Sequence, residues 1–192
     1  MLRIGIYGGS FNPVHFGHVG MARWVIENTD LDELWLMVSP NNPLKPAGGL
    51  APEQERLAAV REAIQDIPHL KASDFEFSLP RPSYTANTLR ELQKAYPEHE
   101  FTLVIGEDNL AIFDQWREWE YIAKNFRILV YPRNLSGEII VPPAGKEAGL
   151  SVKRSFSETV FQAKPVKEIR YLSEAPTFDI SSTAIRRSQG RL

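Results

Sequence analysis

The chain has 192 residues, of which 43% are hydrophobic and 24% charged, the composition of an ordinary globular protein with one sizeable core. Its formal net charge of −2 and isoelectric point near 6.1 exclude a nucleic-acid binder that relies on bulk attraction to phosphates. Cysteine is absent, so disulfides and thiol catalysis are excluded, and no apolar run approaches the ~20 residues of a membrane span. The amino terminus lacks the layout of a secretory signal, and we therefore expect a cytoplasmic protein.

The first eighteen residues hold the most informative pattern. Leu2 to Tyr7 form an apolar run that predicts a short buried strand, and Gly8 and Gly9 favour a turn where a side chain would clash. Asn12 is expected to cap a helix that begins at Pro13, since the asparagine oxygen accepts a free amide and proline has no amide hydrogen to leave unpaired.

His15 and His18 lie three residues apart, which places both imidazoles on one face of the expected helix, near its positive end. This arrangement favours phosphate binding. The alternatives are a partly buried pair on an amphipathic face or half of a metal site. A zinc site needs more ligands, and the other histidines, His69 and His99, lie in polar, turn-like stretches, so we predict no protein-held metal.

The next elements form a strand, helix and strand unit. Helical spacing of apolar residues continues over 19–26, and the nearly continuous apolar run 34–38 predicts a strand covered on both faces, as in a parallel sheet. The loop 39–49 follows at the carboxyl end of this strand, which is the ligand side of open parallel sheets. Lys45 lies in this loop, and composition alone would leave it in solvent.

A second helix is predicted to open at 52–53, with a third strand over 71–77. A polar helix start follows, which Ser83 or Thr85 is expected to cap, and the apolar run 101–106 predicts a fourth strand.

Several side chains beyond these strands are candidates for ligand binding. Asp108 follows the fourth strand directly, where a carboxylate can accept hydrogen bonds from ribose hydroxyls or a metal-bound water. Trp116 fits either a core position or a flat wall that stacks on a ring. Arg133 follows a fifth strand at 127–131 and fits a phosphate contact as well as a solvated position. Arg56 is expected to be solvated, and the alternative is that its long side chain reaches a ligand.

The last third of the chain is predicted less completely. Residues 134–150 suggest a surface excursion, 151–166 receive no assignment, and 169–172 suggest a sixth strand. A turn over 180–186 then leads into a final helix, where three hydroxyl residues and free amides precede an arginine one turn later. The alternative is an ordinary helix cap with a solvated arginine.

Two of these stretches resemble a known family. Residues 8–18, GGSFNPVHFGH, resemble the GGTFDPxHxGH signature of the nucleotidyltransferase superfamily, whose histidine pair grips a nucleotide triphosphate. Residues 180–186, ISSTAIR, resemble its second signature, ISSTxxR. Asn12 stands where the family usually has aspartate, a change that removes a charge but keeps the capping ability.

Two further stretches resemble a narrower branch, the nicotinate-nucleotide adenylyltransferases. Residues 82–89, PSYTANTL, resemble its PSYTxxTL element, and 105–116 resemble IGxDxLxxFxxW. Leu44 replaces a histidine that such enzymes often carry before the loop lysine, and Arg117 replaces a common tyrosine, which leaves part of the base pocket uncertain. Relatives usually continue with a further apolar helix, which is not seen before Leu192.

The resemblance implies a Rossmann-like α/β fold: a doubly wound, mostly parallel sheet with helices on both faces, in a single domain over 1–192. The activity it implies is adenylyl transfer from ATP, with Mg2+, to nicotinate mononucleotide. The implied catalytic residues are His15, His18, Lys45 and Arg186. The implied ATP-binding residues are Gly8, Gly9, Ser10, Phe11, His15, His18, Gly106, Asp108, Ser181, Ser182, Thr183 and Arg186. The implied acceptor-binding residues are Tyr84, Thr85, Trp116, Lys45 and Arg133.

Three other functions compete with this one. Phosphopantetheine adenylyltransferases share both phosphate motifs but lack the two narrower elements. A class I aminoacyl-tRNA synthetase fragment has a similar histidine pair but would need a lysine-rich second loop and a tRNA-binding surface. A nucleotide sensor without turnover is the third. The sequence leaves open whether the chain forms a homo-oligomer and whether the amide mononucleotide is also an acceptor.

Overall fold

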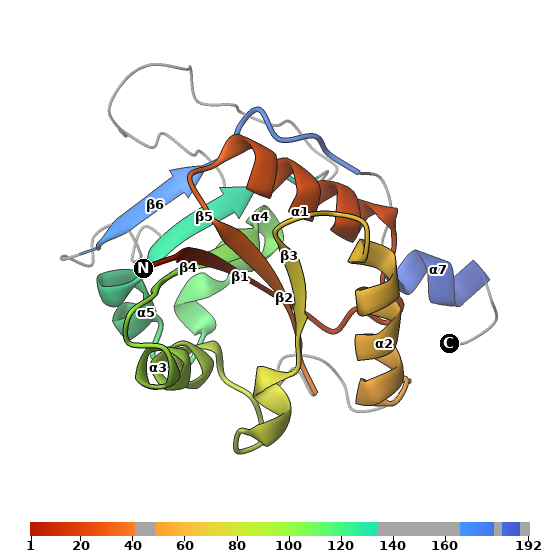
Figure 1. The fold of residues 1–192 in the computed structure, drawn as a ribbon, viewed down its shortest axis with the longest axis horizontal. Coiled ribbons are helices and arrows are strands. Elements are labelled where there is room, and N and C mark those ends of the chain that lie inside the picture. The colour runs from red at the N-terminus through yellow and green to blue at the C-terminus, as the bar shows by residue number, and fades with distance from the viewer. Residues whose placement is uncertain (41–48, 134–165, 179–181, 189–192) are drawn as a thin grey trace.

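The computed structural model describes residues 1–40, 49–133, 166–178 and 182–188, and in these ranges six parallel strands form one sheet in the order β3-β2-β1-β4-β5-β6 (Figure 1). The strands are β1 (Arg3–Gly9), β2 (Glu33–Val38), β3 (Leu70–Ser73), β4 (Glu100–Gly106), β5 (Arg127–Tyr131) and β6 (Glu168–Tyr171). The strand order reverses between β1 and β4, which is the point where open α/β sheets bind ligands.

Helices cover both faces of the sheet (Figure 1). One face carries α1 (Phe16–Asn28) and α2 (Glu53–Ile64), and the other carries α3 (Thr85–Ala95), α4 (Glu107–Leu110) and α5 (Trp119–Asn125). A short helix, α7 (Ser182–Ser188), lies at the rim of the molecule. The predicted doubly wound fold is confirmed, and none of the described helices is long and apolar enough to cross a membrane.

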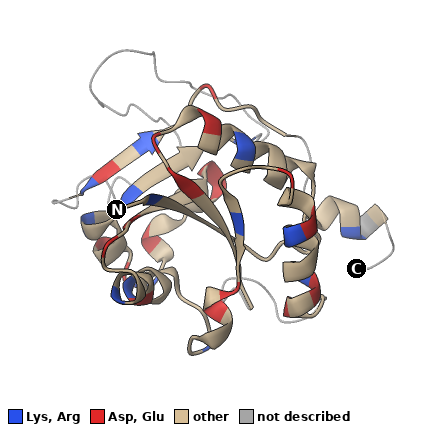
Figure 2. Ribbon diagram, in the orientation of Figure 1, with Lys and Arg blue, Asp and Glu red and all other residues tan. Residues whose placement is uncertain are grey.

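Two apolar layers hold the helices on the sheet. Successive strand residues point to opposite faces, so Ile6 of β1 joins the layer under α3 and α5 while Tyr7 joins the layer under α1 and α2. Leu89 of α3 and Val25 of α1 are each fully buried in their layers. The four central strands are buried on both faces, which is why they appear in the sequence as nearly continuous apolar runs. Charged residues of both signs are spread over the helices, the loops and the outer strands, while the middles of β1 and β4 carry none (Figure 2).

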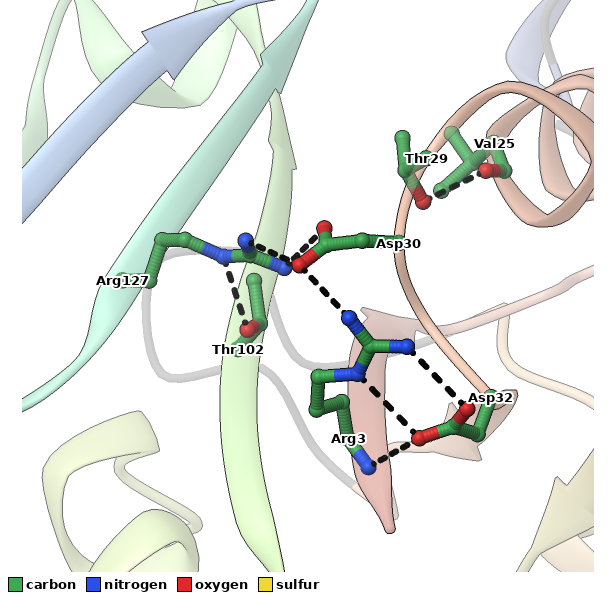
Figure 3. A network of polar contacts seen from close by, with 7 residues as sticks. All are labelled: Arg3, Val25, Thr29, Asp30, Asp32, Thr102 and Arg127. Carbon is green, nitrogen blue, oxygen red and sulfur yellow. Dashed lines mark hydrogen bonds and ion pairs between the residues drawn. The ribbon is translucent and has the colours of Figure 1, made fainter.

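A polar network ties three strands together at the amino ends of the sheet (Figure 3). Asp30, in the connection between α1 and β2, accepts hydrogen bonds from Arg3 of β1 at 3.2 Å and from Arg127 of β5 at 2.9 Å. Arg3 also donates its backbone amide to Asp32 at 2.7 Å, and Arg127 donates to Thr102 of β4 at 3.2 Å. The hydrogen bond from Arg127 is the main cause of a lowered pKa at Asp30, so this carboxylate stays charged.

The structure corrects the expected start of α1. The helix begins at Phe16 with His15 as its N-cap residue, so Asn12 is not the cap and Pro13 is not the first helical residue. The Asn12 side chain instead donates to the carbonyl of Gly49 at 2.8 Å and accepts from the amide of Ala51 at 3.1 Å. The side-chain amide of Asn12, which was expected to cap a helix, therefore bonds to the backbone of a segment distant in the sequence.

Three other expectations need correction. β1 continues through Gly8 and Gly9, which pair with Met37 and Val38 of β2, and the turn comes at Phe11, whose φ is 43°. β3 ends at Ser73 and is followed by a 3₁₀ turn over Phe75–Ser78 rather than by more strand. The N-cap position of α3 belongs to Tyr84, and neither neighbouring hydroxyl caps the helix.

Candidate functional site

The candidate site lies at the carboxyl ends of β1, β4 and β5, around the reversal of strand order. β1 ends at Gly9 and leads to the histidine pair, while β4 ends at Gly106 and leads directly to Asp108 in α4. Arg133 follows the end of β5, which pairs with β4. Two chain segments predicted to bind ATP and one predicted to bind the acceptor therefore follow strands that end at the same edge of the sheet.

The two histidines of the first motif lie against each other. His15 is the N-cap residue of α1 and His18 is in its first turn, and their rings stack with centroids 3.7 Å apart. The backbone amide of His15 donates to Nδ1 of His18 at 3.3 Å. This bond makes Nδ1 an acceptor, so a neutral His18 carries its proton on Nε2. The predicted side-by-side placement of the two imidazoles is correct, although His15 stands at the helix boundary.

His15 is electrostatically unusual. Its Nδ1 atom is buried and has no hydrogen-bond partner among the described residues. Burial, and secondly the positive charge of Arg133, lower the pKa of this imidazole from 6.5 to about 4. His15 is therefore neutral at pH 7 before any anion binds, because no negative charge offsets its desolvation.

Gly8 and Gly9 serve different purposes. A Cβ at Gly8 would meet nothing within 4 Å, so this end of β1 is open. A Cβ at Gly9 would lie 3.0 Å from the ring of Phe11, which is 1% exposed and packs edge-on against His18 at 5.0 Å. Gly9 thus leaves room for the phenylalanine that supports the histidine pair, which is a packing reason rather than the turn expected from the sequence.

The carboxy-terminal motif docks against the segment just before the histidines. Ser182 donates its hydroxyl to the carbonyl of Pro13 at 2.9 Å. The guanidinium of Arg186 donates from Nη1 to the carbonyl of Asn12, 174 positions away in the sequence, and from Nη2 to the hydroxyl of Thr183 at 3.2 Å. The two motifs therefore converge as predicted, and Arg186 is not an ordinary solvated arginine.

Aromatic packing fastens the segment before α7 to α1. The ring of Phe178 lies so close to Gly20 that a Cβ there would be 2.5 Å from it. The same ring contacts Phe16 edge-on at 6.1 Å. The second motif is therefore anchored to the helix that carries the first, which explains how motifs far apart in sequence share one location.

A chain of partly buried polar contacts holds Arg133 at this edge of the sheet. Its Nε lies 3.5 Å from Oδ1 of Asp108, and its Nη2 donates to the hydroxyl of Tyr131 at 3.3 Å. Tyr131 in turn donates to the hydroxyl of Tyr7 at 3.2 Å, and burial raises the pKa of that phenol well above its usual value. The Arg133 side chain is partly exposed and partly packed against Asp108 and Tyr131. A Cβ at Gly106 would fall 2.3 Å from Asp108 Oδ1, so a larger residue there would require the Asp108 side chain to move.

Arg56 is a structural residue that the sequence reading missed. It is 3% exposed, and its guanidinium donates to the carbonyls of Ser10 at 2.6 Å, Ser39 at 2.8 Å, Pro40 at 3.3 Å and Ala51 at 2.9 Å. It therefore holds the segments after β1 and β2 to the start of α2, and it is not solvated. Its position next to the apolar stripe of α2 was the signal in the sequence that could have indicated burial.

Three of the five residues expected to bind the acceptor, Tyr84, Thr85 and Trp116, lie on the α3 side of the sheet. Tyr84 and Thr85 stand at the start of α3, and the guanidinium of Arg117 lies 4.8 Å above the ring of Tyr84. Trp116 is half-buried against Phe113, with ring centroids 5.4 Å apart, and its indole nitrogen is buried without a hydrogen bond in the described ranges. Trp116 thus has both a core side and an unpaired donor.

A small cavity of about 180 Å³ lies beside Tyr84 and Arg117. It is lined by Pro80, Arg81, Pro82, Tyr84, Asn87, Arg117 and Glu118.

Two predicted site residues, Lys45 and Ser181, lie outside the described residues. In the part of the chain that the structure describes, no three histidine, aspartate or glutamate side chains gather where they would hold a metal ion. The described hydrogen-bond donors at the site are imidazoles, guanidinium groups, hydroxyls and backbone amides, which suit phosphate oxygens.

Comparison with known proteins identifies close relatives. A family model described as cytidylyltransferase-like matches residues 6–188. A protein of Bacteroides thetaiotaomicron named probable nicotinate-nucleotide adenylyltransferase is 45% identical over 188 residues, 97% of this chain and 81% of the relative. A protein of the same name from Gluconobacter oxydans is 40% identical over 197 residues, 97% of this chain and 95% of the relative.

Solved structures give the same picture of the fold. The nicotinic acid mononucleotide adenylyltransferase of Plasmodium falciparum, complexed with NaAD, matches with a TM-score of 0.70 at 15% identity, over 97% of this chain and 83% of the other. A putative nicotinate-nucleotide adenylyltransferase from Vibrio parahaemolyticus matches with a TM-score of 0.58 at 26% identity, over 69% of this chain and 74% of the other.

Proposed function

The chain belongs to the nicotinate-nucleotide adenylyltransferases, within the cytidylyltransferase-like family, and from this premise we propose how its residues transfer an adenylyl group from ATP to nicotinate mononucleotide. The products are nicotinate adenine dinucleotide and pyrophosphate, a step of NAD biosynthesis. The observation that carries the proposal is the convergence of the histidine pair with Ser182 and Arg186 at the reversal of strand order.

The reaction needs no covalent enzyme intermediate. An oxygen of the mononucleotide 5′-phosphate attacks the α-phosphorus of ATP, and the bond from that phosphorus to the bridging oxygen breaks to release pyrophosphate. Because the attacking phosphate is already a nucleophile, the protein contributes alignment of two anions and compensation of charge on the leaving group. His15, His18, Lys45 and Arg186 supply that compensation.

Binding of the triphosphate changes the state of His15. A nearby anion favours the protonated imidazole, so the pKa of His15, about 4 in the free protein, rises when the phosphates arrive. This rise increases the protonated fraction of the imidazole and so favours its donation to the leaving group. His18, whose Nδ1 is held by the amide of His15, presents Nε2 to the same anion.

Mg2+ would neutralise charge on the β- and γ-phosphates when ATP brings it to the site. The described side chains and amides fit this arrangement, because they would bind phosphate oxygens while the nucleotide phosphates would hold the Mg2+ ion. Asp108 is the carboxylate that would accept hydrogen bonds from the ribose hydroxyls or from water on the ion. Its contact with Arg133 at 3.5 Å holds it in place.

The acceptor binds on the α3 side in this proposal. Trp116 forms a flat wall for the pyridine ring, and Thr85 with the free amides at the start of α3 receives the ring carboxylate. Tyr84 closes the same end of the pocket. Arg133, at the other end of the acceptor, meets its phosphate.

The function is tested by pyrophosphate release from ATP and Mg2+ with nicotinate mononucleotide as acceptor. Release with this acceptor, and not with 4′-phosphopantetheine, distinguishes the activity from that of the sister adenylyltransferases, and absence of release would indicate a sensor. We expect the change His18→Ala to lower kcat by roughly 10², the effect of removing one electrostatic stabiliser.

The matched control is His69→Asn. His69 is exposed at the start of β3, and its φ of 68° is one that asparagine tolerates. This variant should keep the turnover of the unmodified protein. Unchanged turnover in His18→Ala would remove that histidine from the mechanism.

A further inference from the structure

We propose that Arg117 is a specificity-determining residue that selects the acid mononucleotide over its amide counterpart, by placing a cation against the ring carboxylate. The inference rests on the proposed function, since it concerns the acceptor of that reaction. It begins from a departure in the sequence: Arg117 stands where the resembled family commonly has tyrosine.

Arg117 is held at the acceptor pocket by its neighbours. Its guanidinium lies 4.8 Å from the centre of the Tyr84 ring, within the range of a cation–π contact. It lines the cavity of about 180 Å³ together with Tyr84 and Asn87, both at the start of α3. Trp116 precedes Arg117 and Thr85 follows Tyr84, so this cation lies on the same two chain segments as the residues proposed to hold the pyridine ring.

The charges around the cavity leave Arg117 as the cation with the weakest acidic partner. Arg81 is bound to the carboxylate of Glu53, with Nη2 at 3.0 and 2.8 Å from its two oxygens. Glu118 is bound to Arg90 at 2.7 Å, and its distance to Nε of Arg117 is 4.0 Å.

Each of the two close pairs cancels its own charge, so the cavity keeps a net positive charge that is centred on Arg117. An anion of small size is the ligand that this field favours.

The ring carboxylate fits this position better than the acceptor phosphate does. The stacking wall at Trp116 and the aromatic ring of Tyr84 suit the pyridine end of the mononucleotide, and a planar guanidinium matches a carboxylate in two parallel hydrogen bonds. The amide counterpart has no charge and presents an NH2 group toward the cation. It would lose the charge-assisted bonds and keep only the stacking, which is the basis of discrimination.

The test compares kcat/KM for nicotinate mononucleotide and for nicotinamide mononucleotide in the variant Arg117→Ala. We expect KM for the acid to rise roughly tenfold, the loss of one partly exposed charge-assisted contact, with KM for the amide and for ATP unchanged. Arg117→Lys should restore part of the acid preference, because it keeps the charge but loses the stack on Tyr84. The preference of the unmodified protein should also weaken as salt is raised.

The matched control is Arg81→Ala, which removes a cation from the same cavity wall but one already neutralised by Glu53. It should leave the acid-to-amide ratio within about twofold. Equal changes for both acceptors in Arg117→Ala, or none, would overturn the inference while leaving the proposed function intact. Absence of pyrophosphate release by the unmodified protein with either acceptor would instead overturn the function itself.

Discussion

Burial and the positive charge of Arg133 together keep His15 neutral, with a pKa of about 4, in a site that must bind a polyanion. Arg133 is itself held by Asp108 and by the hydroxyl of Tyr131, so it cannot turn away from the imidazole without breaking two contacts. At the scale of residues, the unliganded site therefore carries a positive charge on Arg133 and none on the neighbouring His15. This arrangement lowers repulsion within the unliganded site.

The coupling between the two residues can be measured directly. The change Arg133→Gln removes the cation that lowers the pKa of His15, so that pKa should rise toward 6.5 while burial still keeps it below that value. Titration of the His15 ring protons by NMR measures the shift. Arg23→Gln, which breaks the exposed pair with Glu27, is the control and should leave it unchanged. An unaltered His15 pKa in Arg133→Gln would show that burial alone is responsible.

At the scale of elements, α1 and α2 are positioned by side chains that bond to loop backbone. Asn12 bonds to Gly49 and Ala51 before α2, and Arg56 reaches back from α2 to the segments after β1 and β2. Both residues looked like local features of a helix in the sequence. Their real partners are backbone groups of other segments, which anchor the loops where phosphates are proposed to bind.

The variant Arg56→Met should show how much these bonds stabilise the protein. It keeps most of the side-chain volume but leaves four carbonyls without their donor. We expect the free energy of unfolding in urea to fall by about 3 kcal/mol. Arg61→Met, on the exposed side of α2 with a 3.6 Å contact to Asp74, should change it by less than about 0.5 kcal/mol. Equal effects of the two changes would contradict the role assigned to Arg56.

At the scale of the whole molecule, the reversal of strand order brings the ends of β1 and β4 together, and the polar network around Asp30 braces the opposite end of the sheet (Figure 3). Function and bracing thus occupy opposite edges of the same strands. Arg3 and Arg127 enter the network from β1 and β5, on either side of β4. Loss of Asp30 should therefore loosen the register of the central strands without touching the site.

The variant Asp30→Ala should lower the free energy of unfolding by about 1 kcal/mol at pH 7, since the carboxylate is partly exposed and shared by two arginines. The pKa of Asp30 is lowered in the folded protein, so its contribution is present above the unfolded pKa and is lost as pH falls through the folded one. The difference between variant and unmodified protein should therefore shrink below about pH 4. Urea denaturation at pH 7 and below about pH 4 measures this difference in the free energy of unfolding. Glu27→Ala is the control. A difference that does not depend on pH would contradict the ion-pair explanation.

The sequence by itself determined how the six strands follow one another along the chain, together with α1, α2, α3 and the final helix, because apolar periodicity is a local property of the chain. The short helices α4 and α5, between β4 and β5, were not predicted. The sequence also determined that His15 and His18 share one location, because their spacing is local too. The proximity of Arg186 to this pair followed only from the family resemblance, since nothing in the residues between them specifies it.

Only the tertiary structure decided what the polar side chains do. The amide of Asn12, the guanidinium of Arg56 and the Arg133 contact with Tyr131 depend on which backbone and hydroxyl groups the fold brings near. The type of a polar residue does not specify which distant group it will hydrogen-bond to, whereas an apolar side chain needs only to be buried. For this reason the strands and most of the described helices could be predicted from the sequence, while the hydrogen bonds that shape the site could not.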